Sequence, residues 1–299
     1  MQRSLILTFI VVLCVSAVAQ KTADLGPLDE TEKAFSRMAA AQGAKAAFLS
    51  FLSEDSVVFR PDRVNGREFW KSQPDNSSFL LVRHATFSDL AASGMLGYTT
   101  GDWGTHPHGK PDSASRFGQY ATIWEKRLDG KFHATVDISI EHEQFAKGDL
   151  KKIEFKPKKS RDINKRGWSV ADASMNFMRS GMTHIGMSGA YDRFAAPDIR
   201  VLLPDLPPIT GRKNAITAMR DYRWVEFPKK VALLQSADMA YNWNPCQFIN
   251  SAEGIISGNC LQVWKLRDKK WWIVLSVFAP LMNEKPPELK VRDKPKAGN

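Results

Sequence analysis

The stretch that decides the fold spans residues 118–140 and reads GQYATIWEKRLDGKFHATVDISI. Tyr120, Thr122 and Trp124 alternate with the residues between them, and a similar alternation resumes after the Asp129-Gly130 pair. A period of two is typical of β-strands, and an Asp-Gly pair readily takes the positive φ angles of a tight hairpin turn. The sequence therefore predicts a long antiparallel hairpin here.

The same pattern returns about 140 residues later. Residues 260–277 read CLQVWKLRDKKWWIVLSV, with Trp264 in the position of Trp124. Three further segments match upstream at offsets of 143 to 145 residues: 55–62 with 198–205, 66–67 with 211–212, and 93–98 with 236–241. Because the offset stays steady over so long a stretch, we expect two tandem copies of one globular domain.

The N-terminus resembles a secretory signal peptide at residues 1–19. Arg3 precedes an apolar run, and Ala17-Val18-Ala19 supplies the small residues of a cleavage site. The run is shorter than the roughly 18 residues that a membrane span needs. We expect the mature chain to begin near Ala19 and to be exported as a soluble protein, periplasmic or extracellular.

The charge is concentrated outside the two copies. The chain is 43% hydrophobic, with 9 Trp and 17 Phe, and its net charge is +10. Residues 143–166 contribute +5 and residues 284–299 contribute +2. We interpret the first segment as a basic linker and the second as a disordered tail. Since no nucleic-acid-binding motif accompanies this charge, we expect no nucleic-acid partner.

Each copy opens with helical periodicity. Residues 31–52 and 173–195 have apolar side chains at three- and four-residue steps, with a glycine inside each run, Gly43 and Gly186. Residues 87–98 then read as one strand. Helices followed by a curved antiparallel sheet give an α+β fold class, with two tandem cone-shaped domains.

Four motifs of the first copy carry a family resemblance: Ser53-Glu54-Asp55, Arg60-Pro61, SGMLGYTTG at 93–101 and ATIWEKRLDGKF at 121–132. With them, each copy resembles a SnoaL-like or ketosteroid-isomerase-like domain of the nuclear transport factor 2 superfamily, closest to its bacterial branch of unknown function. The resemblance implies domains at 28–142 and 167–283, each with a pocket between helices and sheet. It also implies pairing through the outer sheet face, within one chain or in a homodimer.

The isomerase chemistry of that family does not transfer to this chain. The family's general base corresponds to Arg60 and Leu203, which cannot accept a proton from carbon at neutral pH. By strand alternation Asp137 shares a face with His133 and Thr135, so it is a weak catalytic candidate; its counterpart is Ser276. The alternative is a solvent-facing carboxylate.

Aromatic side chains are candidates for lining an apolar pocket. No metal site or cofactor is expected. A metal needs three or four converging ligands, and although Asp102 and Asp112 lie near His106 and His108, two histidines that flank a proline in a Gly-rich loop are more often exposed to solvent. The Ala-rich first helices predict that the first domain binds apolar ligands better than the second. The ligand-binding candidates are Tyr98, Trp103, Tyr120, Trp124, Tyr241, Trp243 and Trp264.

Cys246 and Cys260 are the cysteines that remain after signal removal. They are placed symmetrically about a predicted hairpin loop, so we expect them to oppose each other and to form a disulfide in an oxidising compartment. Two buried free thiols are the alternative.

These observations favour an exported protein that binds a small apolar molecule in two cone-shaped pockets. One alternative is an isomerase, cyclase or hydrolase that uses the first pocket, so enzymatic activity stays open. The other is a protein-interaction module.

Overall fold

The computed structural model describes residues 24–75, 79–107, 116–142, 169–226, 228, 232–250, 252 and 254–281. The predicted signal peptide, basic linker and tail lie outside the described residues. Among the described residues, no helix has the length and apolar character that crossing a membrane requires.

Helices come first in each half of the chain and strands follow. We call residues 24–142 the first half and residues 169–281 the second half. The first half contains α1 (Gly26–Gln42), α2 (Ala44–Phe51), β1 (Leu52–Phe59), β2 (Arg63–Asn65), α3 (Gly66–Ser72), β3 (Phe79–Leu90), β4 (Leu96–Pro107), β5 (Arg116–Lys126) and β6 (Phe132–His142). The second half contains α4 (Val170–Met182), α5 (Gly186–Phe194), β7 (Ala195–Leu202), β8 (Ile209–Thr210), α6 (Arg212–Ala218), β9 (Tyr222–Trp224), β10 (Ala232–Ser236), β11 (Met239–Asn250), β12 (Gly254–Arg267) and β13 (Lys270–Pro280).

The α+β class is confirmed, but each sheet is mixed rather than wholly antiparallel. The first sheet has the order β2-β1-β6-β5-β4-β3, and the second has the order β10-β11-β12-β13-β7-β8. In both, the strand that follows the helices pairs in parallel with the last strand of the half: β1 with β6, and β7 with β13.

The two predicted hairpins are confirmed as β5–β6 and β12–β13. Their turns use positive φ angles at Gly130 in the first half and at Asp268 and Lys269 in the second. The single strand predicted over residues 87–98 is wrong, because the chain reverses there between β3 and β4. Gly94 adopts a φ of 71° in that reversal, and the Ala91 N–H donates to the Leu96 carbonyl.

Corresponding positions make the same contacts in the two halves. Arg127 forms an ion pair with Asp55 at 2.8 Å, and Arg267 forms one with Asp198 at 2.6 Å. The residues of the second pair follow those of the first by 140 and 143 positions. Each ion pair joins the closing hairpin of its half to the strand that follows the helices. The same contact therefore holds the same two parts of the sheet together in both halves.

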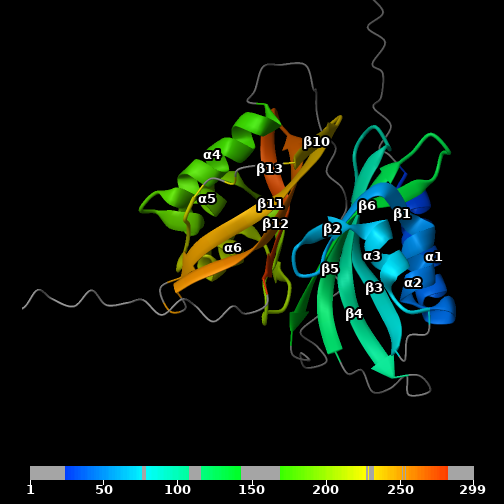
Figure 1. The fold of residues 1–299 in the computed structure, drawn as a ribbon. Helices are drawn as coiled ribbons and strands as arrows, with labels where there is room; N and C mark the ends of the chain where they lie inside the picture. The colour runs from blue at the N-terminus through cyan, green and yellow to red at the C-terminus, as the bar shows by residue number, and fades with distance from the viewer. Residues whose placement is uncertain are drawn as a thin grey trace, which may run out of the picture.

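The two sheets pack face to face, with helices on the outside of both (Figure 1). One apolar cluster lies under the helices of each half, and a third contains residues of both sheets, among them Tyr98, Ile138, Tyr241 and Val277. Polar contacts cross the same boundary. The Ser93 and Ser236 hydroxyls, at equivalent turns, lie 2.9 Å apart.

Lys265 is the charged centre of this boundary. Its Nζ lies 3.2 Å from Asp89 Oδ1 and 3.7 Å from Asp238 Oδ2, and it donates to the Leu90 carbonyl at 2.7 Å. All three charged side chains are buried. Asp238 also accepts a hydrogen bond from the Ala92 N–H of the other half at 2.6 Å. One cation therefore neutralises carboxylates from both halves.

We predict that Lys265→Met destabilises the chain by about 3 to 5 kcal/mol, because it leaves two carboxylates buried without their cation. Denaturant unfolding followed by tryptophan fluorescence measures the change. Lys213→Met, at an exposed position of α6, is the matched control and should change stability by less than about 0.5 kcal/mol. Adding Asp89→Asn and Asp238→Asn to Lys265→Met should restore much of the loss. An unchanged midpoint for Lys265→Met would contradict this role.

Candidate functional site

The helix-covered face of the first sheet holds a buried charge network. Arg83 of β3 lies between Glu32 of α1 and Asp137 of β6. Its Nη1 donates to Asp137 Oδ2 at 3.0 Å, and its Nε lies 3.7 Å from Glu32 Oε1. Arg83 also donates to the Thr122 hydroxyl at 2.6 Å, which in turn donates to Asp137 Oδ2 at 2.7 Å. Asp137 is only 2% exposed, so the solvent-facing alternative is wrong.

A β-bulge explains why strand alternation misplaces the neighbours of Asp137. Ile123 pairs with Val136, whereas Trp124 pairs with Ala134, so Thr135 is the extra residue. A bulge shifts the alternation that follows it by one position. Asp137 therefore lies on the same helix-covered side as Ala134, and the face predicted for Asp137 together with Thr135 is wrong.

Aromatic and hydroxyl groups complete this network around Glu32. Glu32 accepts from the Tyr120 hydroxyl at 2.9 Å and from the Thr99 hydroxyl at 2.6 Å. Thr99 accepts from Trp124 Nε1 at 2.9 Å. The Arg83 guanidinium lies 3.5 Å from the centre of the Tyr120 ring. Nearly every polar atom therefore has a partner inside the protein.

The electrostatics hold Arg83 in its charged form. Burial on its own lowers the pKa of Arg83, but the charges of Glu32 and Asp137 outweigh it and raise that pKa above its usual range. Burial also raises the pKa of Tyr120 well above its usual value, and the charge of Glu32 adds to the shift. Arg60, 27% exposed and 4.0 Å from Asp137 Oδ1, supplies a second cation at the edge of the network. Two cations thus balance two carboxylates.

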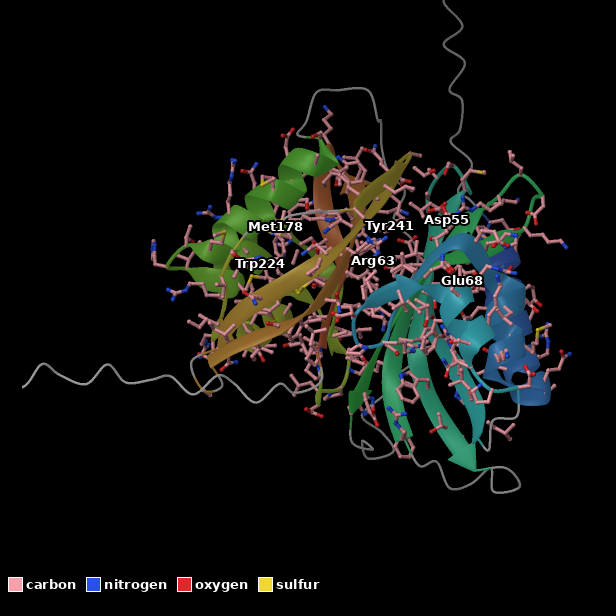
Figure 2. The ribbon with its side chains drawn as sticks, viewed as in Figure 1. Asp55, Arg63, Glu68, Met178, Trp224 and Tyr241 are labelled. Atoms are coloured by element: carbon pink, nitrogen blue, oxygen red, sulfur yellow. A yellow bond between two sulfur atoms is a disulfide. The ribbon has the colours of Figure 1, made fainter. Side chains whose placement is uncertain are left out.

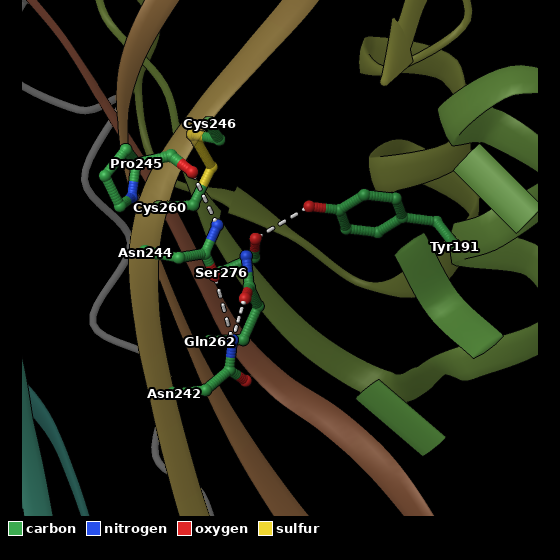
Figure 3. The surroundings of a disulfide bond; sticks show 8 residues. All are labelled: Tyr191, Asn242, Asn244, Pro245, Cys246, Cys260, Gln262 and Ser276. Carbon is green, nitrogen blue, oxygen red and sulfur yellow. Dashed lines mark hydrogen bonds between the residues drawn. A yellow bond between two sulfur atoms is a disulfide. The ribbon is translucent and has the colours of Figure 1, made fainter. Parts of the chain in front are cut away.

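The equivalent positions of the second half carry neutral groups instead (Figure 3). Ser276 replaces Asp137 and accepts a hydrogen bond from the Tyr191 hydroxyl at 2.7 Å. Asn242 donates to Gln262 at 2.7 Å and accepts from Trp264 Nε1 at 2.6 Å. Burial raises the pKa of Tyr191 to about 12, although its bond to Ser276 opposes the shift. Among these described positions, the second interior therefore has a neutral hydroxyl where the first has the carboxylate of Asp137.

The disulfide between Cys246 and Cys260 is confirmed, with Cα atoms 6.0 Å apart. The direct opposition that the loop symmetry predicted is wrong, because the two residues lie diagonally across the ladder. Cys246 pairs with Gly258 across the ladder, and Cys260 pairs with Asn244. Gly258 allows this packing because a Cβ there would collide with the Phe278 ring and the Ala279 carbonyl.

The predicted pocket aromatics divide between two faces. Tyr120, Trp124 and Trp264 lie on the helix-covered faces with the networks above. Trp103, half-buried, packs over Gly118 and donates to the Gln119 carbonyl at 3.2 Å.

The other three predicted aromatics, Tyr98, Tyr241 and Trp243, pack between the sheets. Trp243 meets the Phe59 ring and the Arg63 guanidinium, and Tyr241 donates to Glu125 (Figure 2 labels Arg63 and Tyr241). These three belong to the contact between the halves. Their ligand role stays an untested prediction, as it does for the four on the helix-covered faces.

A cavity of about 660 Å³ opens in the second half, which the sequence did not single out. It lies between α4, the end of α5 and the turn that joins β12 to β13. Its lining is Ala173, Asn176, Arg179, Ser180, Thr183, Arg193, Phe194, Lys269, Lys270 and Trp271. These residues are separated by up to about 100 positions, so no local motif marks them. Its size suits a small organic ligand.

Among the described residues, no group of three or more His, Cys, Asp or Glu side chains could hold a metal ion. His106 of the histidine pair is described and half-buried, whereas His108 lies outside the described residues.

No family model and no curated protein matches this chain. Solved structures are similar to part of it at low identity. One is a nuclear transport factor 2-like protein from Cytophaga hutchinsonii, 12% identical over 38% of this chain and 95% of its own, with a TM-score of 0.32. Another, of the same type and of unknown function, comes from Shewanella oneidensis: 15% identical over 38% and 95%, TM-score 0.31. A protein of unknown function from Mycobacterium tuberculosis is 16% identical over 41% and 82%, TM-score 0.32. Similarities at this level assign no activity.

We predict that Asp137→Asn destabilises the protein by about 3 kcal/mol, because Arg83 then carries a buried charge with one carboxylate fewer. Thermal or denaturant unfolding measures the change. Asp62→Asn, at an exposed turn position, is the control and should alter stability by less than about 0.5 kcal/mol. Equal effects of the two substitutions would show that the network does not stabilise the fold.

Proposed function

We propose that this protein is an exported binder of a small, largely apolar molecule. It would consist of two tandem SnoaL-like domains, at 28–142 and 167–283, which pair within one chain where single-domain relatives pair as homodimers. The observation that supports binding most directly is the cavity of about 660 Å³ in the second half. Its floor is apolar, since Phe194 and Trp271 are 6% and 5% exposed and Ala173 is 3% exposed.

The two interiors favour the second half as the ligand site. In the first half, charged side chains fill the space between helices and sheet and bind one another. The Ala-rich helices of that half predict the opposite preference, but the buried Ala39 and Ala47 pack in an apolar cluster with Phe35 and Phe48. We therefore place the ligand of this proposal in the second half.

Export is supported by two features. The apolar N-terminal run has the composition of a signal peptide, and the Cys246–Cys260 disulfide suits an oxidising compartment.

The enzyme alternative depends on Asp137. Its interior position favours a chemical role, because carboxylates in a buried pocket are common acid-base groups. However, the same Oδ2 atom already accepts hydrogen bonds from Arg83 and Thr122. The other oxygen of Asp137, Oδ1, lies 4.0 Å from Arg60. The carboxylate therefore has a structural role among cations, which accounts for its burial without catalysis.

We predict that Ser180→Phe blocks ligand entry, because Ser180 lines the cavity from α4. The neutral dye N-phenyl-1-naphthylamine, whose fluorescence rises in apolar surroundings, should bind the wild type and bind the variant at least about tenfold more weakly. Met175→Phe, on the exposed side of the same helix at 39% exposure, is the control and should bind like the wild type. Native mass spectrometry of the freshly purified wild type should also show a co-purified small molecule. No dye binding by the wild type would contradict the proposal.

A further inference from the structure

The rim of the cavity is cationic while its floor is apolar. Arg179 on α4, Arg193 at the end of α5, and Lys269 and Lys270 in the β12–β13 turn are all exposed and all line the opening. Three separate elements therefore bring four positive charges around one hollow. No Asp or Glu belongs to the described lining residues.

Nearby carboxylates do not neutralise these cations in ion pairs. Among the described residues, none of the four forms an ion pair. Of the neighbouring acids, Asp172 is engaged in the capping box with Ser169, and Asp198 pairs with Arg267. Asp268 adjoins Lys269 in the turn and is exposed, and among the described residues it forms no ion pair with a rim cation. Desolvation and then the charge of Arg212 lower the pKa of Lys270, and the charge of Asp192 opposes the shift.

Lys270 holds the rim in place rather than extending into it. Its Nζ donates to the Arg193 carbonyl at 2.8 Å and lies 3.8 Å from the centre of the Trp272 ring. This contact ties the hairpin turn to the end of α5. Arg179, Arg193 and Lys269 remain the cations available to a ligand.

Neutral donors lie between rim and floor. Asn176, half-buried on α4, and the indole of Trp271 line the cavity between the exposed cations and the buried apolar side chains. The lining thus offers donors and cations but no carboxylate.

The first half lacks this arrangement. By the offset of 143 residues in the helices and 139 residues at the turn, Ser50 stands in the place of Arg193, Gly130 in the place of Lys269 and Lys131 in the place of Lys270. Asp129 binds Lys131 N and His133 within its own turn. The cationic rim therefore distinguishes the second half.

We propose that the cavity takes a soluble amphipathic anion. Its aromatic or aliphatic body lies against Phe194 and Trp271, and its carboxylate, sulfonate or phosphate group meets Arg179, Arg193 and Lys269. This inference rests on the proposed binding function and specifies the ligand class. A free molecule fits better than a membrane headgroup, because the apolar floor is recessed behind the charged rim and the body must enter it.

Two dyes with the same anilinonaphthalene body test the charge requirement on the full chain. One is 8-anilinonaphthalene-1-sulfonate, and the other is its neutral counterpart N-phenyl-1-naphthylamine. We expect the wild type to bind the sulfonate at least about tenfold more tightly, with an advantage that shrinks as salt screens the rim. The triple variant Arg179→Gln, Arg193→Gln and Lys269→Gln should lose about tenfold in affinity for the sulfonate and keep its affinity for the neutral dye.

A matched set of substitutions controls for net charge. Lys213→Gln with Arg220→Gln and Arg223→Gln also removes three exposed cations of the same half, none of which lines the cavity, and should leave both affinities unchanged. Equal affinity of the wild type for the two dyes would overturn the anion proposal while leaving the binding function intact. Failure to bind either dye would overturn both. Co-sedimentation with phosphatidylglycerol vesicles that depends on the three rim cations would also overturn the proposal, since it would assign them to a membrane surface.

Discussion

The packing of the two sheets against each other is the contact on which the rest of the structure depends. Each sheet has helices on one face only, so its other face would expose a broad apolar surface if the half stood alone. Tyr98, Tyr241 and their neighbours bury that surface, and Lys265 neutralises Asp89 and Asp238 at the same boundary. Because these two sheet faces cover each other, the helix-covered faces remain as the places where the two halves differ.

The two halves share the same arrangement of helices and sheet, and they differ in the side chains that lie between helices and sheet. Asp137 with Arg83 and Glu32 fills the first interior with balanced charges, whereas Ser276 and Asn242 make hydrogen bonds between neutral groups in the described part of the second. A buried, balanced ionic network is expensive to rearrange, which suits a structural half. The second half has a disulfide between β11 and β12 and an open cavity beside α4. We infer that one half supports the fold and the other meets the ligand.

The sequence predicted what depends on local pattern and repetition. Alternation and turn residues predicted both closing hairpins, and the cysteine spacing predicted the disulfide. Alternation failed at Thr135, because a bulge leaves no mark in a single strand. It also failed at residues 87–98, where a tight reversal contains only one glycine. Glu32 and Arg83 were missed because nothing local connects a helix residue to a strand residue 51 positions later. The cavity cations were missed for the same reason.

Hydrogen–deuterium exchange of the full chain, with and without saturating 8-anilinonaphthalene-1-sulfonate, locates the ligand in the fold. We expect slower exchange in α4, in the last turn of α5 and at the β12–β13 turn, with the first half unchanged. Protection confined to α1, β3 and β6 would contradict this expectation, since the ligand would then occupy the first interior beside Asp137.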